Sequence, residues 1–198
     1  DCDPVKGYVR LAMTRRQADH LRATAGELER HKAPGEVRFL EQADLGAIVG
    51  SDAYHAGLYT GSEGHLHPLN LALGEAQALD GLGGRIYEQS AATHIQYDQT
   101  GGPVRITTQN GTVSADTLVL CGNAYLEKLE PRLCPTLVPG YSGIIATEPM
   151  AADIVKRIMP HPVACSDMRT VMDYYRLTPD GRLLWGGLAH WTGDDSED

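Results

Sequence analysis

The segment from residue 68 to residue 123 constrains the fold more than any other part of this chain, because it joins a helix, a strand, a hairpin and an apolar run. Pro68 suits the first turn of a helix, where its missing N–H costs nothing. Gly83 and Gly84 end that helix, and residues 85–97 form a strand-like run. The helical spacing predicts a buried stripe of Leu69, Ala72, Leu73, Ala76 and Leu79.

A β-hairpin and an apolar run follow in the same segment. Asn110-Gly111, within residues 104–115, is the strongest short signal for a hairpin turn. Residues 117–121 are a continuous apolar run, which predicts a strand buried on both faces, as in a parallel sheet covered by helices. Gly122 at its end either lets a ligand approach the backbone or simply turns the chain, and both interpretations stay open.

The first 67 residues contain one well-marked helix start. Thr14 and Gln17 form a capping box, because the threonine accepts from the Gln17 backbone while the glutamine reaches back. Residues 6–13 and 37–40 are predicted to be short strands. Residues 50–67, which are rich in Gly, Ser and His, are predicted to form an irregular loop.

The last third of the chain predicts a second antiparallel region. Residues 143–147 predict a strand, and residues 154–159 a short helix. A further hairpin is predicted around Pro179-Asp180-Gly181. Because such hairpins outnumber parallel crossings, the predicted fold class is α+β.

Charge and cysteine content exclude several classes of partner. With 17 Lys+Arg against 26 Asp+Glu, the net charge is −9, and no basic run is available for nucleic acid or an anionic membrane. No apolar stretch approaches the roughly 18 residues of a membrane-spanning helix. Four widely spaced cysteines favour a reduced, cytoplasmic setting over a disulfide scaffold.

Several segments resemble flavin-dependent amine and amino-acid oxidoreductases of the D-amino acid oxidase superfamily. These segments are residues 63–70, 83–90 and 115–125, together with residues 138–149, 172–177 and 181–187. Within the superfamily the chain is most similar to the gamma-glutamylputrescine oxidases. The resemblance covers nearly the whole chain.

The resemblance implies a division into three segments and a set of cofactor contacts. Residues 1–61 and 136–198 are expected to form an antiparallel-sheet substrate domain over the flavin. Residues 62–135 are expected to be the middle part of an α/β FAD-binding domain. The residues expected beside FAD are His65, His67, Ala92, Thr93, Cys121, Gly122 and Asn123.

The resemblance also implies a substrate-facing hairpin that carries Tyr174, Tyr175 and Arg176. Packing within the sheet is an equally good interpretation of the two tyrosines. Amino-acid oxidases of the superfamily place an arginine on this hairpin to bind the substrate carboxylate, where this chain has Thr178. This departure favours an amine or polyamine-type substrate.

The expected function is the oxidation of a gamma-glutamylputrescine-like or other small amino compound to an imine or aldehyde. Dioxygen is the expected acceptor, and no catalytic residue can be assigned. Relatives open with a strand, a GxGxxG loop and a helix that hold the FAD pyrophosphate, and this sequence has no such motif. We therefore expect an internal section of a longer oxidoreductase that is inactive alone and does not retain FAD. The alternative is a stand-alone, non-catalytic α+β module that binds a ligand.

The histidines and Cys121 have less specific interpretations as well. His65 and His67 lie two residues apart and could hold a metal, but a third ligand at suitable spacing is lacking, so no metal site is assigned. His67 can instead cap the helix that starts at Pro68. Cys121, in the apolar run, is expected to be an inert buried thiol.

Overall fold

The chain folds into two compact units, which a computed structural model describes for residues 1–138 and 140–190. The first unit comprises residues 1–75 together with residues 141–190, and the second unit takes up the residues between them. Each unit is considered by itself.

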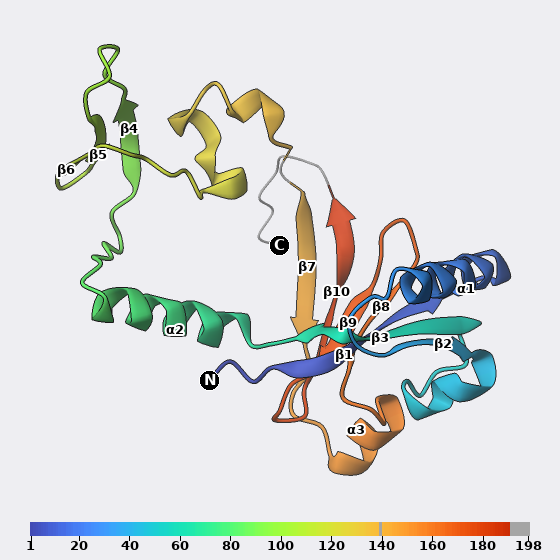
Figure 1. Cartoon of the computed structure of the whole chain (residues 1–198). Coiled ribbons are helices and arrows are strands. Elements are labelled where there is room, and N and C mark those ends of the chain that lie inside the picture. The colour runs from blue at the N-terminus through green and yellow to red at the C-terminus, as the bar shows by residue number, and fades with distance from the viewer. Residues whose placement is uncertain (139, 191–198) are drawn as a thin grey trace. The chain divides into compact units, whose positions relative to one another are not determined.

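The first unit is built on a seven-stranded sheet with the order β2-β3-β1-β8-β9-β10-β7 (Figure 1). Its strands are β1 (Val5–Ala12), β2 (Val37–Glu41), β3 (Ala56–His65), β7 (Tyr141–Ala146), β8 (Ala164–Asp167), β9 (Tyr174–Leu177) and β10 (Leu183–His190). Among the described strands β1 and β8 pair in parallel, and the other neighbours are antiparallel. The predicted α+β class and the hairpin around residues 179–181 are confirmed.

The two faces of this sheet are covered by different elements. Helix α1 (Arg15–Arg30) packs Leu21 and Ala25 against Leu58 and neighbouring residues of one face. The 3₁₀ helix η1 (Gln42–Ala47) and helix α3 (Ala152–Ile158) lie toward the opposite face (Figure 1). The core on that side includes Val9 and Leu11 of β1, which are fully buried. Each such side chain contributes about 1.5–3 kcal/mol of burial free energy.

The capping box at the start of α1 is confirmed. The Gln17 backbone N–H donates to the Thr14 hydroxyl at 3.2 Å. The Gln17 side-chain oxygen accepts from the Thr14 N–H at 3.1 Å and from the Met13 N–H at 2.8 Å. The helix therefore starts where local hydrogen bonding predicts, because these N–H groups have no intrahelical partner.

The irregular loop predicted over residues 50–67 is wrong for Ala56–His65, which form β3 between β2 and β1 in the sheet. The glycines that suggested a loop serve close packing instead. A Cβ on Gly57 would lie 3.0 Å from Leu45 and 3.1 Å from Val9, so a larger residue would push into the core. Glycine inside a strand marks such a close approach as well as a turn.

The second unit holds a three-stranded antiparallel sheet of β4 (Ala92–Gln96), β5 (Val104–Thr108) and β6 (Thr112–Ala115). The hairpin predicted at Asn110-Gly111 is confirmed. The strand-like run of residues 85–97 is shorter than predicted, and Gln89 before β4 has a positive φ of 51°. Two 3₁₀ helices follow, η2 (Asn123–Leu129) and η3 (Cys134–Thr136).

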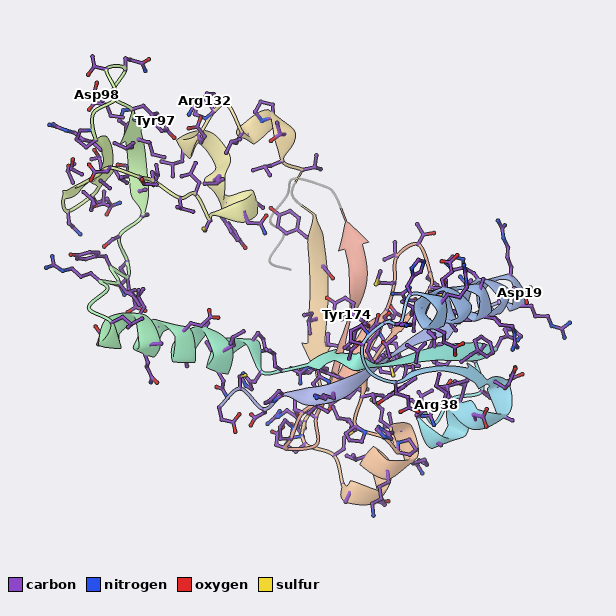
Figure 2. The ribbon with its side chains drawn as sticks, in the orientation of Figure 1. Asp19, Arg38, Tyr97, Asp98, Arg132 and Tyr174 are labelled. Atoms are coloured by element: carbon purple, nitrogen blue, oxygen red, sulfur yellow. The ribbon has the colours of Figure 1, made fainter. Side chains whose placement is uncertain are left out.

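A carboxylate ties the end of β4 to the segment after η2. Glu130, which is 3% exposed, accepts 2.7 Å hydrogen bonds from the Tyr97 hydroxyl and from the Arg132 guanidinium. Figure 2 shows Tyr97 and Arg132 in this unit, and the guanidinium lies 4.8 Å from the centre of the Tyr97 ring. These bonds hold the pKa of the Glu130 carboxyl at about 2, chiefly because Arg132 donates to it.

The strand predicted for residues 117–121 is absent, since these residues form neither helix nor strand and Val119 is 73% exposed. A strand buried on both faces needs neighbouring strands and covering helices, and the described residues supply neither here. Cys121 is correspondingly exposed, which corrects its expected burial.

Helix α2 (Pro68–Gly81) starts at Pro68 as predicted. It ends before Gly83, whose φ of 84° lets the chain leave the helix. The expected burial of its apolar stripe is wrong, because no residue of α2 is buried in the described structure. Helical periodicity shows which residues share a face, whereas burial needs a second surface, and the described residues leave this face open.

Candidate functional site

Alternation along β9 places its side chains on opposite faces of the seven-stranded sheet. Tyr174 and Arg176 share one face, and Tyr175 between them lies on the other. Cross-strand pairing places Ser166, Gly186 and Ile144 in the row of Tyr174. This face of the sheet, beside the part covered by α1, carries a pocket of about 430 Å³.

The pocket has apolar walls and a few hydroxyl groups. Besides residues of β9 its walls include Tyr8, Leu66, Ile144, Ser166, Met172 and Leu184. The Tyr8 and Ser166 hydroxyls are hydrogen bonded to each other. Among the described residues around this pocket none is acidic, and Arg176 is the one Lys or Arg.

Tyr174, which is labelled in Figure 2, is held in place from two sides. Its hydroxyl lies 3.1 Å from the Ser142 hydroxyl of β7. Its ring covers Gly186 of β10, where an added Cβ would lie 2.5 Å from the Tyr174 hydroxyl oxygen and closer still to the ring. A residue without a side chain at position 186 therefore lets the ring lie flat on the sheet.

Tyr175 belongs to the core on the opposite face. It is 4% exposed, stacks on Trp185 with ring centres 4.4 Å apart, and donates a 3.0 Å hydrogen bond to the Tyr54 hydroxyl. Burial raises the pKa of the Tyr175 hydroxyl far above its ordinary value, so the group stays protonated. Burial also raises the pKa of the neighbouring Cys165 thiol to about 12.

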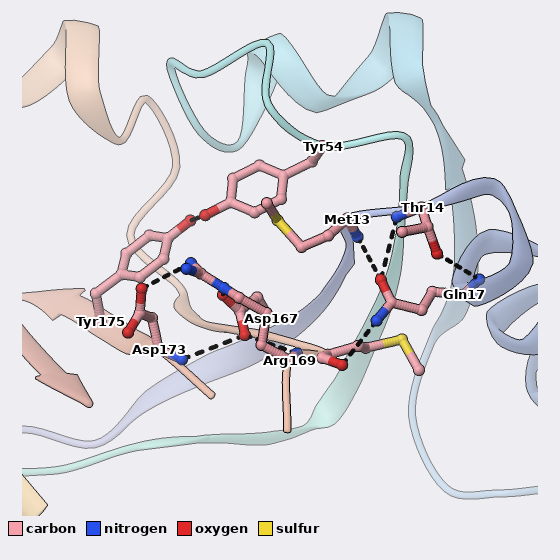
Figure 3. A network of polar contacts seen from close by, with 9 residues as sticks. Met13, Thr14, Gln17, Tyr54, Asp167, Arg169, Asp173 and Tyr175 are labelled. Atoms are coloured by element: carbon pink, nitrogen blue, oxygen red, sulfur yellow. Dashed lines mark hydrogen bonds and ion pairs between the residues drawn. The ribbon is translucent and has the colours of Figure 1, made fainter. Parts of the chain in front are cut away.

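An ion pair between a buried carboxylate and a half-exposed arginine fixes the loop that leads into β9 (Figure 3). Asp167, 2% exposed, accepts hydrogen bonds from the Arg169 guanidinium and from the Asp173 backbone N–H, the latter at 3.2 Å. The Gln17 side chain of α1 donates to the Met168 carbonyl at 2.7 Å. Met172 in this loop lines the pocket, so the network positions one of its walls.

Arg176 also borders a second pocket of about 350 Å³, whose lining includes His65 and His67. The His65 Nδ1 is buried and has no hydrogen-bond partner among the described residues. Burial, and then the positive charge of Arg176, lower the pKa of His65, so this imidazole is neutral near pH 7. Burial likewise lowers the pKa of the Arg176 guanidinium.

His67 caps α2, as one sequence interpretation predicted. Its Nδ1 accepts a 3.3 Å hydrogen bond from the Asn70 N–H. Its carbonyl accepts from the Leu71 N–H at 3.1 Å. Within the described ranges, no group of three or more His, Cys, Asp or Glu side chains is arranged to hold a metal ion.

The other predicted FAD contacts lie in the second unit. Ala92 and Thr93 begin β4, and the Thr93 hydroxyl donates to the Thr107 carbonyl at 3.2 Å. Gly122 precedes η2, and a Cβ there would lie 2.8 Å from Leu126. Asn123 has a positive φ of 47°. Their contact with FAD stays a prediction.

Thr178, which occupies the place expected for an arginine, is engaged in the hairpin turn. Its hydroxyl donates to the Asp180 carboxylate and accepts a 3.0 Å hydrogen bond from the Arg182 N–H.

Sequence reasoning missed Tyr8, Ser142, Ser166 and Gly186 as pocket or supporting residues. Their signal is the period-2 alternation of each strand, which becomes informative once the strand register is known.

In the part of the chain that the structure covers, no helix has the length and apolar character needed to cross a bilayer.

Over residues 1–198 the sequence matches the protein family described as FAD dependent oxidoreductase. Gamma-glutamylputrescine oxidoreductase of Escherichia coli (strain K12) is 39% identical over 202 residues, which are 100% of this chain and 46% of that protein. Probable oxidoreductase OrdL of Haemophilus influenzae is 35% identical over 93% of this chain and 43% of its own length.

Solved structures share the fold. Glycine oxidase from Geobacillus kaustophilus aligns with a TM-score of 0.75 at 22% identity, over 98% of this chain and 50% of that one. Iminodiacetate oxidase from Chelativorans sp. BNC1 aligns with a TM-score of 0.71 at 15% identity, over 100% of this chain and 52% of that one. The chain spans less than half the length of the curated relatives it matches. It belongs to the family of FAD-dependent oxidoreductases, as its resemblance to the D-amino acid oxidase superfamily predicted.

Proposed function

We propose that the protein containing this chain is an FAD-dependent oxidoreductase that oxidises a small amine at the carbon bearing the nitrogen. The observation that carries the proposal is the open sheet face with Tyr174 and Arg176, in a chain that matches the family over its whole length. The 39% identity to gamma-glutamylputrescine oxidoreductase favours gamma-glutamylputrescine or a related amine as substrate.

The composition of the pocket supports an amine that reacts in its neutral form. Apolar walls disfavour an ammonium ion, and so does the positive charge of Arg176. No carboxylate among the described lining residues would hold the cation. The Tyr8 and Tyr174 hydroxyls can orient a neutral amine through hydrogen bonds. Loss of the ammonium proton on binding removes the need for a dedicated general base.

We assign residues 1–61 and 136–198 to the substrate domain and residues 62–135 to the FAD-binding domain. Bound FAD would supply a hydride acceptor for the substrate carbon, and dioxygen is the proposed final acceptor of the electrons. The apolar run of residues 117–121, in which Val119 is 73% exposed, fits a surface that the cofactor or the rest of this domain would cover. Gly122, His65 and the start of β4 are the contacts we propose. Four free cysteines suit a cytoplasmic location.

Anaerobic flavin reduction tests the proposal. The flavin-loaded enzyme is mixed with gamma-glutamylputrescine, putrescine or glycine, and bleaching of the flavin is followed, with peroxide formation measured in air. We expect the amines gamma-glutamylputrescine and putrescine to bleach the flavin. We also expect a lower kcat/KM for Tyr174→Phe than for the control Tyr59→Phe, because Tyr59 of β3 is outside the lining described for this pocket. Binding of the amines without bleaching would instead support the non-catalytic module.

A further inference from the structure

The hydroxyl group of Ser142 on β7 makes two contacts, and together they determine the direction in which its hydrogen points. The Ser142 oxygen lies 3.1 Å from the Gly187 carbonyl oxygen of β10 and 3.1 Å from the Tyr174 hydroxyl oxygen of β9. A carbonyl oxygen only accepts, and a serine hydroxyl has a single hydrogen to donate. Both contacts are hydrogen bonds only if Ser142 donates to Gly187 and Tyr174 donates to Ser142. The opposite direction would take this donor away from the carbonyl of Gly187, which is a buried residue.

This direction makes Tyr174 an acceptor toward the pocket. A tyrosine hydroxyl has one hydrogen, and its oxygen has lone pairs that accept. With the hydrogen directed at Ser142, only the lone pairs remain for a ligand in the pocket of about 430 Å³ that Tyr174 lines. Among the described residues no other protein group is hydrogen bonded to this hydroxyl. Tyr174 is therefore arranged to bind a ligand that donates a hydrogen bond.

The second hydroxyl pair of the pocket, Tyr8 with Ser166, has no such fixed direction. Either oxygen can be the donor in their contact. Within the described chain no carbonyl accepts from the Ser166 hydroxyl, so nothing sets the direction of its hydrogen. Tyr8 can therefore donate to a ligand or accept from it, and a preference for ligand donors depends on Tyr174.

An accepting hydroxyl suits the oxidation of an amine. When the C–H bond beside the nitrogen breaks, its hydrogen leaves with the electron pair to the hydride acceptor of the proposed function, and the nitrogen lone pair forms the new C=N bond. A hydrogen bond donated to the nitrogen would occupy that lone pair. A hydrogen bond accepted from the N–H group leaves the lone pair free, so the direction of the Tyr174 hydroxyl affects the reaction as well as binding.

We propose that Ser142 is a positioning residue that orients the Tyr174 hydroxyl as an acceptor, so that the pocket prefers N–H donors and the lone pair of a bound amine stays free. Ser142 is outside the lining described for the pocket, so it acts through Tyr174. The inference rests on the proposed function and deepens it, because it gives the means by which the site holds a neutral amine ready to react.

Ultraviolet resonance Raman spectroscopy of the flavin-loaded enzyme measures the direction of this hydrogen bond. The intensity ratio of the tyrosine doublet differs between a hydroxyl that donates and one that only accepts, and subtraction of the Tyr174→Phe spectrum isolates one tyrosine of the nine. We expect a donating hydroxyl in the wild type and in Ser142→Thr, which keeps the hydroxyl group. We expect the donation to be lost in Ser142→Ala, which should fold normally because Ser142 is exposed.

The matched control is Ser62→Ala, which removes an exposed serine of β3 outside the pocket lining and should leave the spectrum unchanged. A Tyr174 hydroxyl that does not donate in the wild type would overturn the proposal. Identical spectra of the wild type and Ser142→Ala would overturn it as well.

Two uncharged probes of nearly the same shape test the preference for donors. Indole has an N–H donor, whereas benzoxazole has an acceptor nitrogen and no donor. By calorimetry we expect the wild type to bind indole about three- to tenfold more tightly than benzoxazole, the usual effect of one hydrogen bond. In Ser142→Ala the Tyr174 hydroxyl can turn and donate, so this ratio should fall toward one, and Ser142→Thr should keep the wild-type ratio.

A double-mutant cycle shows whether Ser142 acts through Tyr174. In a Tyr174→Phe background the ratio should already be near one, and Ser142→Ala should have no further effect, because the two hydroxyls act together. Equal affinity for the two probes in the wild type, or the same effect of Ser142→Ala in both backgrounds, would overturn the proposal.

Kinetics with the amines of the flavin-reduction assay separate the positioning role from the proposed function. Ser142→Ala should lower kcat about three- to tenfold with little change in KM, and Ser142→Thr should restore kcat. An unchanged kcat in Ser142→Ala with normal flavin reduction overturns the positioning role and leaves the function standing. A donating Tyr174 hydroxyl and a preference for indole, together with no oxidation of any amine, overturn the function and support the positioning role.

Discussion

Gly186→Ala should destabilise the first unit by displacing Tyr174. The new Cβ would lie 2.5 Å from the Tyr174 hydroxyl oxygen and closer to two ring carbons, far inside van der Waals contact. The ring must move away, because the Cβ is fixed to the backbone of β10. Overpacking in a well-packed core costs about 1–3 kcal/mol, and we expect a cost near the lower end because the Tyr174 ring is only partly buried. The movement also breaks the 3.1 Å contact between the Tyr174 and Ser142 hydroxyls.

Urea unfolding followed by circular dichroism measures this cost. The matched control is Gly143→Ala on the adjacent strand β7, where an added Cβ meets no atom within 4 Å and should be neutral or slightly stabilising. A double-mutant cycle isolates the clash, since Gly186→Ala should cost much less in a Tyr174→Ala background. An equal loss of stability in both backgrounds, or the same effect at positions 186 and 143, would refute the reasoning.

Three further predictions concern other parts of the chain. Thr14→Ala removes the α1 cap and should lower the free energy of unfolding by about 0.5–2 kcal/mol in urea, whereas a loss no larger than that of Thr24→Ala in the middle of the helix would contradict it. At pH 8 the Cys165 thiol, with its pKa near 12, should resist Ellman's reagent until urea is added, while the exposed Cys121 and Cys134 react; fast reaction of Cys165 in the folded protein would be inconsistent with its burial. The pKa of Glu130 is lowered from 4.5 to about 2, so the stability that this carboxylate contributes is present above pH 4.5 and is lost as the pH falls toward 2. Glu130→Gln should therefore flatten the pH dependence of the unfolding midpoint in that range, and Glu75→Gln should not.

Signals that lie within a few residues were sufficient to predict much of the local structure. The capping box of Thr14 and Gln17, the helix start at Pro68 and the two hairpin turns depend on hydrogen bonds and backbone angles of adjacent residues. The family resemblance was also readable from the sequence, because it depends on the order of such segments. The sequence analysis predicted Tyr174, Tyr175 and Arg176 as one substrate-facing group. It did not separate Tyr174 and Arg176, which face the pocket, from Tyr175, which lies in the core.

Tertiary structure decided everything that depends on distant partners. It made β3 an inner strand of the sheet, because Gly57 can pack against Leu45 and Val9 where a local pattern indicates a loop. It left Val119 and α2 exposed, since burial requires a second surface as well as an apolar sequence. The sequence by itself determines interactions between residues that are a few positions apart, such as caps and turns. Packing and charge balance depend on contacts between residues far apart in the chain, so only the tertiary structure decides them.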